Sequence, residues 1–313
     1  MTRAGTARVA LFALLLAGVF AAATIAGRTL APTSAAGGEP NQPQGEVQPV
    51  QSMHDAHGET TKEAHHHSTA TTHGTSGHGG AGASGLASVE GGYRLVPTRT
   101  RVPVGREVDF AFRILDQDGR PVTSFVTKHE RDLHLIVVRR DLSGFQHLHP
   151  AMAADGTWTT SLRLPEAGVW RVFADFATEQ GSATLGVDVF AAGRFDPVDL
   201  PEPATTAAAD GYQVTVEPTG LAGGQTGSLT FRVARDGQPV TDLEPYLGAR
   251  GHLVALREGD LAYLHVHPTD AATEGASIGF GAELPSAGRY RLYLQFQHDG
   301  QVHTVAFTLE VAS

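Results

Sequence analysis

The stretch that decides the fold begins His134-Leu-Ile-Val-Val-Arg139 and ends Phe145-Gln-His147-Leu-His149-Pro150. It occurs again, 118 residues later, as His252-Leu-Val-Ala-Leu-Arg257 and Leu264-His265-Val-His267-Pro268. The three histidines and the proline keep the same spacing in both copies. A repeat of this length indicates two copies of one structural unit. Histidine is the commonest metal ligand among side chains, so a triplet that is present twice also indicates a chemical role.

Outward from each motif, short segments that alternate apolar and polar residues are separated by turn signals. These segments are Val108–Leu115 and Leu229–Val233, followed by the turns Asp118-Gly119 and Asp236-Gly237. Further on, each copy has an aromatic strand, with Trp170, Phe173 and Phe176 in the first and Tyr290, Tyr293 and Phe296 in the second. Short strands of this kind, without an amphipathic helix, predict an all-β protein. We expect two tandem β-sandwich domains, immunoglobulin-like or cupredoxin-like in outline.

Composition along the chain predicts five segments. Their expected bounds are 1–28 for a signal peptide or membrane anchor, 29–88 for a disordered His-rich linker, 89–191 for the first sandwich, 192–210 for a Pro-rich linker and 211–313 for the second sandwich. Pro197, Pro201 and Pro203 make the short linker semi-stiff.

The first segment has the pattern of an export signal. Arg3 and Arg8 precede an uncharged apolar run from Val9 to Gly27, which ends at Arg28. This run is intermediate between the core of a signal peptide and a minimal membrane span, so both interpretations stay open. An uncleaved anchor would follow the positive-inside tendency. In either case we expect the rest of the chain outside the cytoplasm, secreted or anchored to the cell membrane by this segment.

The second segment is rich in Pro, Gly, Ser, Thr and Ala and has almost no large apolar residue. It cannot bury enough surface to offset the entropy of ordering, so we expect it to be disordered. Scattered histidines in such a tract favour weak capture of metal ions at several sites, and a solvated spacer is the alternative. The histidines of this arm are His54, His57, His65, His66, His67, His73 and His78.

The net charge is −10 at pH 7 with histidine neutral, and the chain contains no cysteine. An acidic chain without a basic patch is not expected to bind nucleic acid. The lack of thiols excludes disulfides, iron–sulfur clusters and blue-copper centres. The three methionines are too few for a thioether-rich copper(I) site.

The two motifs are expected to form β-hairpins. A two-residue turn at 259–260 sets a register in which His252 lies opposite His267. The same separation in the first copy brings His134 opposite His149. Directly opposed residues share a face of the sheet, and the histidine two positions earlier returns to that face. Each sandwich is therefore predicted to carry one three-histidine metal site, with the ligands His134, His147 and His149 in the first and His252, His265 and His267 in the second.

Imidazole nitrogens without sulfur suit Cu(II) or Zn(II), and the Irving–Williams order favours copper when metals compete. The alternative is that the histidines are core residues bonded to backbone carbonyls, because Ile136, Val138 and Phe145 share their face. Candidates for a fourth ligand or a supporting role are His129, Asp132, Met152, His298 and His303.

At these paired motifs the chain resembles a group of poorly characterised exported bacterial proteins with β-sandwich domains. The resemblance covers both folded units, roughly two thirds of the chain. Proteins of that group are associated with the handling of heavy metals, especially copper, in the cell envelope. The resemblance implies a small all-β extracytoplasmic domain, and it does not identify a ligand.

Together these patterns predict an exported metal-binding protein, a copper or zinc chaperone, buffer or resistance factor. The alternative is a non-catalytic extracytoplasmic interaction or adhesion module whose repeated histidines are structural. An enzyme is not expected, because the chain has no Gly-x-Ser-x-Gly elbow, no HExxH motif and no Gly-rich phosphate loop.

Overall fold

The computed structural model describes residues 84–264, 266–269 and 275–313, which all belong to one compact unit that spans 72–313. Every secondary-structure element assigned in these ranges is a β-strand, β1–β20, which confirms the predicted all-β class. No helix in the described part of the chain is long and apolar enough to cross a membrane. The predicted signal peptide or anchor at 1–28, and nearly all of the predicted His-rich linker, lie outside the described residues.

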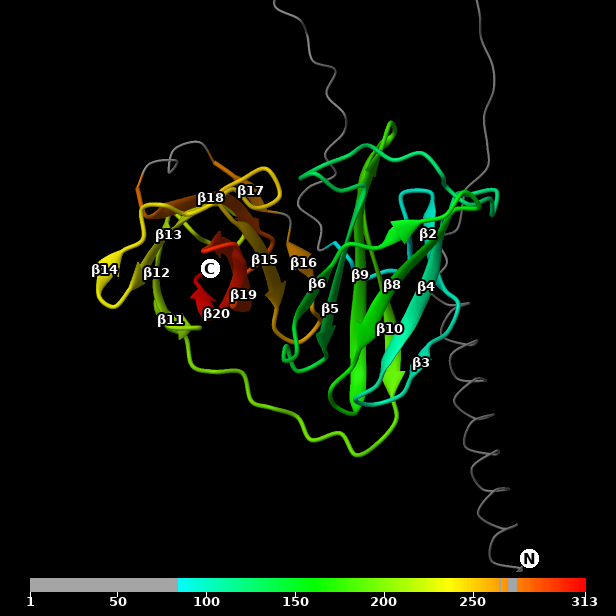
Figure 1. The fold of residues 1–313 in the computed structure, drawn as a ribbon, viewed down its shortest axis with the longest axis horizontal. Helices are drawn as coiled ribbons and strands as arrows, with labels where there is room; N and C mark the ends of the chain where they lie inside the picture. The colour runs from blue at the N-terminus through cyan, green and yellow to red at the C-terminus, as the bar shows by residue number, and fades with distance from the viewer. Residues whose placement is uncertain (1–83, 265, 270–274) are drawn as a thin grey trace, which may run out of the picture. The chain divides into compact units, whose positions relative to one another are not determined.

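The first sandwich has two five-stranded sheets, drawn in cyan to green in Figure 1. One sheet has the spatial order β1 (Val89–Glu90), β2 (Tyr93–Pro97), β4 (Glu107–Leu115), β8 (Thr157–Arg163) and β7 (Ala151–Met152). The other has the order β3 (Arg101–Val102), β10 (Gly181–Ala191), β9 (Gly168–Thr178), β5 (Leu133–Arg139) and β6 (Gln146–Leu148). Strand β3 pairs with β10 in parallel, and the other strand pairs of the two sheets are antiparallel.

The core of the first sandwich lies between these sheets. In β4, Phe110, Phe112 and Ile114 alternate with more exposed residues, and all three are fully buried. In β9, Trp170 and Phe176 reach the same core because they are an even number of residues apart. Burial of a large apolar side chain stabilises a fold by about 1.5–3 kcal/mol, so these positions hold the two sheets together.

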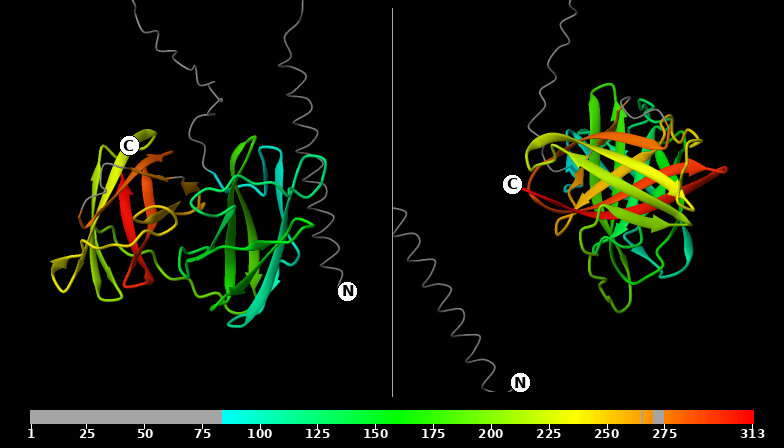
Figure 2. Two further views of the ribbon diagram at one scale, coloured as in Figure 1. Left: turned by 45° about the horizontal axis from the view of Figure 1, so that its top comes forward. Right: turned by 90° about the vertical axis from the view of Figure 1, so that its left-hand side faces the viewer.

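The second sandwich packs a six-stranded sheet on a four-stranded one. The six-stranded sheet contains β11 (Thr206–Ala209), β12 (Tyr212–Thr219), β13 (Gln225–Arg235), β18 (Ser277–Leu284) and β17 (Val266–Pro268), with β14 (Gln238–Pro239) paired to β13. The four-stranded sheet contains β16 (Tyr263–Leu264), β15 (His252–Arg257), β19 (Gly288–His298) and β20 (Gln301–Val311). The yellow strand β13 and the red strand β20 thus belong to different layers, which can be followed in Figure 2.

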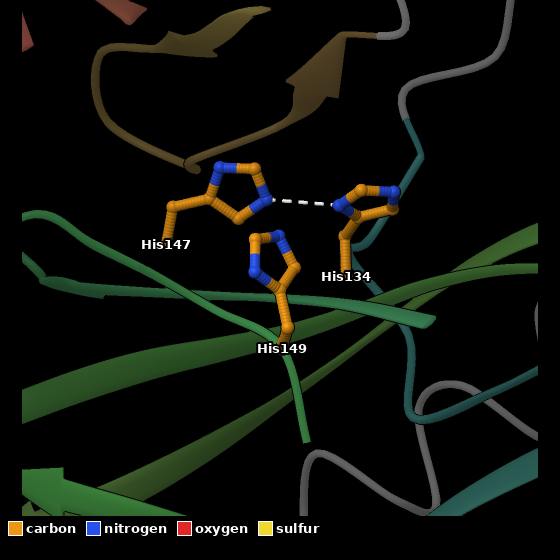
Figure 3. A group of neighbouring side chains, drawn as sticks. All are labelled: His134, His147 and His149. Carbon is orange, nitrogen blue, oxygen red and sulfur yellow. Dashed lines mark hydrogen bonds between the residues drawn. The ribbon is translucent and has the colours of Figure 1, made fainter. Parts of the chain in front are cut away.

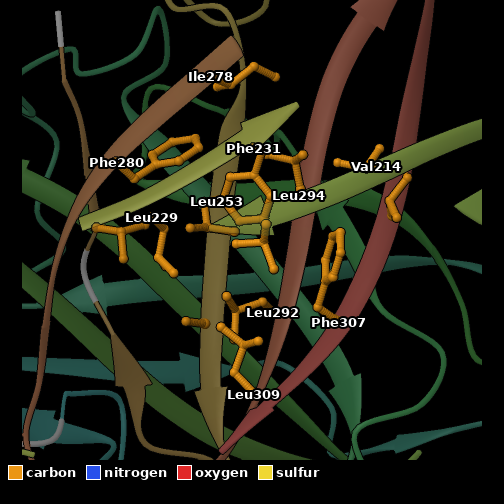
Figure 4. Close-up of a cluster of buried hydrophobic side chains, with 14 of the residues drawn as sticks. Val214, Leu229, Phe231, Leu253, Ile278, Phe280, Leu292, Leu294, Phe307 and Leu309 are labelled. Atoms are coloured by element: carbon orange, nitrogen blue, oxygen red, sulfur yellow. The ribbon is translucent and has the colours of Figure 1, made fainter. Parts of the chain in front are cut away.

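The apolar core of the second sandwich is built from both of its sheets (Figure 4). Phe231 of β13 and Phe280 of β18 come from the six-stranded sheet, and Leu294 and Phe307 come from the four-stranded one. All four are at most 1% exposed. Each sandwich therefore has a core of its own.

Two predicted segment boundaries differ from the structure. Strand β11 begins inside the segment predicted as the 192–210 linker, because its backbone pairs with β12. Residues 84–88, which we call the strap, lie inside the stretch that was predicted to be disordered. The backbone of the strap forms hydrogen bonds with the folded part of the chain, and these bonds stabilise its ordered conformation. Composition alone does not reveal such bonds.

The strap is held by backbone contacts and by one side chain. Arg171 Nη2 donates to the carbonyl oxygens of Gly85 at 2.7 Å and Leu86 at 2.6 Å. The strap lies so close to β10 that a Cβ on Gly186 would be only 2.0 Å from Gly85 O. Glycine is therefore required at position 186 for this approach.

The two sandwiches pack against each other through a third apolar cluster, which we call the junction. Its buried members are Ile136, Val138, Leu142, Phe173, Val254, Leu256, Leu261, Tyr263 and Tyr293. In β5 and β15 these residues alternate with those that enter each sandwich core. This explains why all seven residues of β5 are buried: the strand has apolar partners on both of its faces.

The junction uses equivalent residues of the two repeats. The ring centroids of Phe145 and Tyr293 lie 4.1 Å apart, and those of Phe173 and Tyr263 lie 5.4 Å apart. In the repeat, Phe145 corresponds to Tyr263 and Phe173 to Tyr293. The two contacts are therefore equivalent, and the sandwiches meet in an approximately two-fold arrangement.

Candidate metal centre

The hairpin of the first repeat has the predicted register. Leu135 pairs with Leu148 and Ile136 with His147, which places His149 next in line opposite His134. The ligand nitrogens of His134, His147 and His149 all lie within 4.8 Å of one another. Figure 3 shows the three imidazoles converging on one small volume. The sequence pattern thus located this cluster correctly.

The hairpin of the second repeat differs from the prediction. Its first pairs, Ala255 with Leu264 and Leu256 with Tyr263, have the expected register. Strand β17 then joins the other sheet, where His267 pairs with Gly281 of β18. The prediction that His252 and His267 face each other across one hairpin is therefore wrong. The physical reason is that β18 also presents backbone groups that need partners, and β17 supplies them.

A separate metal site in the second repeat remains a prediction. His265 lies outside the described residues, and the described part of His267 is its backbone position in β17. What the structure does describe is the position of His252, and this histidine lies with those of the first repeat.

His252 extends the cluster across the junction. Its ring centroid lies 5.2 Å from that of His134 and 5.1 Å from that of His147. The His129 ring lies 5.2 Å from His252 and 6.2 Å from His134. Five imidazoles from two repeats therefore gather at one edge of the junction. No local pattern in the sequence indicates this, because it depends on how the two repeats pack.

Two nitrogens of the cluster face each other directly. His134 Nδ1 and His147 Nε2 lie 2.9 Å apart, the contact drawn as a dashed line in Figure 3. The outer nitrogen of each ring faces a carbonyl oxygen: His134 Nε2 is 3.2 Å from Lys128 O, and His147 Nδ1 is 2.6 Å from Gln295 Oε1. Because a carbonyl can only accept, each outer nitrogen carries the hydrogen of a neutral ring. The two inner nitrogens then present lone pairs to each other, an arrangement that needs a shared cation.

The shared cation could be a proton or a metal ion, and burial acts against the proton. Burial is the main cause that lowers the pKa of His147, to about 3, with further contributions from His134 and His149. Burial likewise lowers the pKa of His134 and lowers that of His149 to about 4. The pKa of His252 is lowered to about 2, mainly by burial and then by His147 and His134. These four imidazoles are therefore neutral at pH 7, which is the state in which imidazole binds metals.

His149 contributes a nitrogen with no partner. Its Nε2 is buried and has no hydrogen bond within the described part of the protein. A buried polar atom without a partner costs about 1–3 kcal/mol, so a ligand that satisfied it would stabilise the folded chain. The His149 ring lies 5.3 Å from that of His134 and 4.7 Å from that of His147, close enough to share such a ligand.

A small pocket reaches the cluster beside His134. Its lining includes both charged and imidazole side chains, among them Lys128, His129, Arg131, Asp132 and Asp175. Asp132 accepts a hydrogen bond from Thr127 and lies in this lining rather than among the imidazoles. The side of the cluster at His134 therefore has polar surroundings.

The other candidates for a fourth ligand lie elsewhere. His298 Nδ1 is 2.7 Å from Tyr212 Oη, and its Nε2 is 3.2 Å from Asp242. His303 Nδ1 is 3.2 Å from Asp210. Met152 belongs to β7 and packs on the core of the first sandwich. Of the predicted extra residues, only His129 has its ring at the cluster.

Fold and site together define a class: an all-β protein of two repeated sandwiches with a buried histidine cluster at their junction. A family model described as "Domain of unknown function (DUF8832)" matches residues 87–193 and again 206–313. The chain belongs to this family and contains the domain twice. No curated protein matches the chain.

The chain is weakly similar to several solved structures, including the following three. The Escherichia coli adhesin FdeC is 14% identical over 71% of this chain and 64% of its own, with a TM-score of 0.23. Invasin, a bacterial integrin-binding protein, is 16% identical over 70% and 39%, with a TM-score of 0.21. Domains 4 and 5 of the S-layer protein SbsC are 11% identical over 72% and 100%, with a TM-score of 0.23. The chain thus spans less than two thirds of the length of the two adhesins, and similarity this low indicates nothing about function.

Proposed function

We propose that this protein binds a divalent transition-metal ion, Cu(II) or Zn(II), through His134, His147 and His149. The observation that carries the proposal is the pair of facing nitrogens on His134 and His147, whose outer nitrogens both face carbonyl oxygens. Metal-binding histidines almost always donate their other N–H to a carbonyl or carboxylate, which fixes the tautomer and the ring orientation. Lys128 O and Gln295 Oε1 fill this supporting role.

The geometry also suits an ion. Zinc and copper bind imidazole nitrogen at about 2.0–2.1 Å, so the inner nitrogens of His134 and His147 would separate by only a few tenths of an ångström to share one ion in a tetrahedral site. The third nitrogen would come from His149, whose Nε2 is buried and unpaired. Burial in a polar pocket at the edge of an apolar junction limits competition from water for the same positions.

The biological role that we propose is capture and retention of metal outside the cytoplasm, as a chaperone, buffer or resistance factor. Three features support it: the export-type N-terminus, the His-rich arm and the resemblance to envelope proteins that handle copper. The arm would capture ions weakly, and the buried cluster would hold one more firmly. Binding alone accounts for these features, so we do not propose catalysis.

The test is a metal titration of the purified full chain, with the arm histidines replaced by asparagine to remove their background. The replaced positions are His54, His57, His65, His66, His67, His73 and His78. We expect this background protein to bind Cu(II) or Zn(II) saturably. In the same background, a triple alanine variant of His134, His147 and His149 should lose that binding.

A matched control is the alanine pair His298→Ala and His303→Ala, which removes two buried histidines that lie outside the cluster. Metal affinity should be unchanged in this pair. If the triple variant, shown to be folded by circular dichroism, binds with unchanged stoichiometry and affinity, the proposed site is wrong.

The second candidate function is a non-catalytic interaction module in which the histidines are structural. The observation that favours it is that both histidines already have protein partners: the outer nitrogen of His134 bonds to Lys128 O and that of His147 to Gln295. Thermal melting separates the two candidates, because a ligand that binds only the folded state raises the melting temperature. A melting temperature that does not change when Cu(II) or Zn(II) is added would favour the interaction module.

A further inference from the structure

We propose that His252 is the fourth ligand, so that the bound ion joins the two repeats. The inference rests on the proposed metal site and extends it from one sandwich to both. The ion would then be bound by residues of both repeats across the junction and not by a single hairpin. The residues that carry it are His252 of β15 and the three histidines of the first hairpin, His134, His147 and His149.

Five ring separations among these four histidines fit a four-imidazole site. With metal–nitrogen distances of about 2.0–2.1 Å, the centroids of tetrahedral imidazole ligands lie about 5 Å apart. Within the first repeat, the three ring separations are 5.2, 5.3 and 4.7 Å. From His252, the separations are 5.2 Å to His134 and 5.1 Å to His147. Zinc in structural sites is almost always four-coordinate, and the hairpin of the first repeat alone offers three imidazoles.

His129 is the weaker alternative for this role. The His129 ring lies 5.2 Å from that of His252. It lies 6.2 Å from that of His134, which is farther than the separations among the proposed ligands. His129 lies in the loop between β4 and β5 and has a positive φ of 48°. Its position is therefore set by a loop and not by a strand. His252 is the first residue of β15 and is fixed by pairing with Gln295 of β19.

The second repeat therefore contributes twice to the site. Gln295, directly opposite His252 in the sheet, accepts the hydrogen bond from His147 Nδ1. His252 and Gln295 share the face of the sheet that also carries the junction residues Val254 and Tyr293. An ion bound by His252 and by the first repeat would connect the two sandwiches at the edge of this apolar contact. Metal binding would then depend on the junction, and the junction would be strengthened by metal.

The experiment counts imidazoles. Cu(II) is added at one equivalent to the full chain with the arm histidines replaced, and pulsed electron paramagnetic resonance measures how many imidazoles bind the ion. We expect four in this background and three in His252→Ala. Loss of a residue that only supports a ligand lowers metal affinity about 10–100-fold, and loss of a ligand lowers it at least as much. His252→Ala should therefore also weaken Zn(II) affinity by at least about tenfold. His303→Ala removes a buried histidine outside the cluster and is the matched control that should change neither readout, while His129→Ala tests the alternative ligand.

The outcomes separate this inference from the proposed function. If His252→Ala keeps the imidazole count and the affinity of the background protein, His252 only stacks on its neighbours and the inference is overturned, while the three-histidine site stands. If His129→Ala removes an imidazole and His252→Ala does not, the fourth ligand is His129 and the inference is also overturned. Loss of all saturable binding in folded His134→Ala, with one imidazole fewer in His252→Ala, supports both. Retained binding in the triple variant overturns the proposed function itself.

Discussion

At the scale of single residues, the partners of the imidazoles decide what the cluster can do. Gln295 lies on the second repeat, yet its side-chain oxygen fixes the ring of His147 on the first, at 2.6 Å. Its amide nitrogen donates to Thr304 Oγ1 at 3.2 Å, which holds the side chain in place. A side chain of the second repeat thereby sets the orientation of an imidazole in the first.

We predict that Gln295→Leu weakens metal affinity roughly 10–100-fold, because His147 loses the acceptor that fixes its tautomer. Competition against a chelator of known affinity measures the change. Gln297→Leu is the control: Gln297 lies two residues further along β19, where it donates to Glu244, and its loss should leave affinity unchanged. Equal affinities for the two variants would contradict the assigned role of Gln295.

Acid should destabilise the metal-free protein. The pKa values of His147 and His149 are lowered to about 3 and about 4, mainly by burial, so the folded state stays neutral where the unfolded state takes up protons. Between about pH 6.5 and these lowered values, unfolding gains protons and the free energy of unfolding falls as pH falls. The slope is about 1.4 kcal/mol per pH unit for each such histidine.

Urea unfolding of chelator-treated protein across pH 7 to 5 measures this slope. His147→Gln should flatten it, because one group that titrates only in the unfolded state is gone. An identical slope in wild type and variant would show that His147 is not held neutral by the fold.

At the scale of elements, the hairpins that carry the histidines are closed by ion pairs of unequal burial. In the first repeat, Arg139 Nε and Nη2 both donate to Asp141, at 3.0 and 2.6 Å, and the two side chains are 2% and 6% exposed. The equivalent pair in the second repeat, Arg257 with Asp260, has side chains that are 22% and 40% exposed. The first turn therefore depends on its ion pair much more than the second.

Asp141→Ala should cost up to about 3–5 kcal/mol of stability, because it leaves the buried Arg139 guanidinium with only the more exposed Glu166 as an ionic partner. Asp260→Ala should cost at most about 1 kcal/mol, because its partner stays partly in water. Chemical denaturation of both variants provides the comparison. A cost for Asp260→Ala as large as that for Asp141→Ala would contradict the burial argument.

At the scale of the whole molecule, the junction makes one unit of two sandwiches that have separate cores. Three of its aromatic residues, Phe173, Tyr263 and Tyr293, come from strands whose other face packs in a sandwich core. Tyr293 Oη also donates to Leu142 O across the junction at 2.5 Å. Because the histidine cluster lies at the edge of this contact, assembly of the cluster and docking of the sandwiches are coupled.

Val254→Asp should open the junction while both sandwiches stay folded. Val254 is 1% exposed and packs in the junction rather than in the core of its own domain, so a charge there has no partner unless the sandwiches separate. We expect a larger radius of gyration in small-angle X-ray scattering and two unfolding transitions in calorimetry. Thr215→Asp, on an exposed position of β12, is the control that should keep the wild-type profile.

The sequence by itself determined the repeat, the all-β class and the three-histidine cluster of the first hairpin. These depend on local rules: the period of a strand places His147 and His149 on the face of His134, and turn length sets the register. The same rules were wrong for His252 and His267, because β17 leaves the hairpin to pair with β18. Local pattern contains no information about which sheet supplies a strand's partners.

Only the tertiary structure decided that His252 and Gln295 lie at the cluster of the first repeat. Their place follows from the packing of Ile136 and Val138 together with Val254 and Leu256 at the junction. Apolar packing is not directional, so a sequence shows that these residues need burial without showing what buries them. Positions that are far apart in the chain meet only once such packing is specified, and here that packing gathers histidines of both repeats at one point.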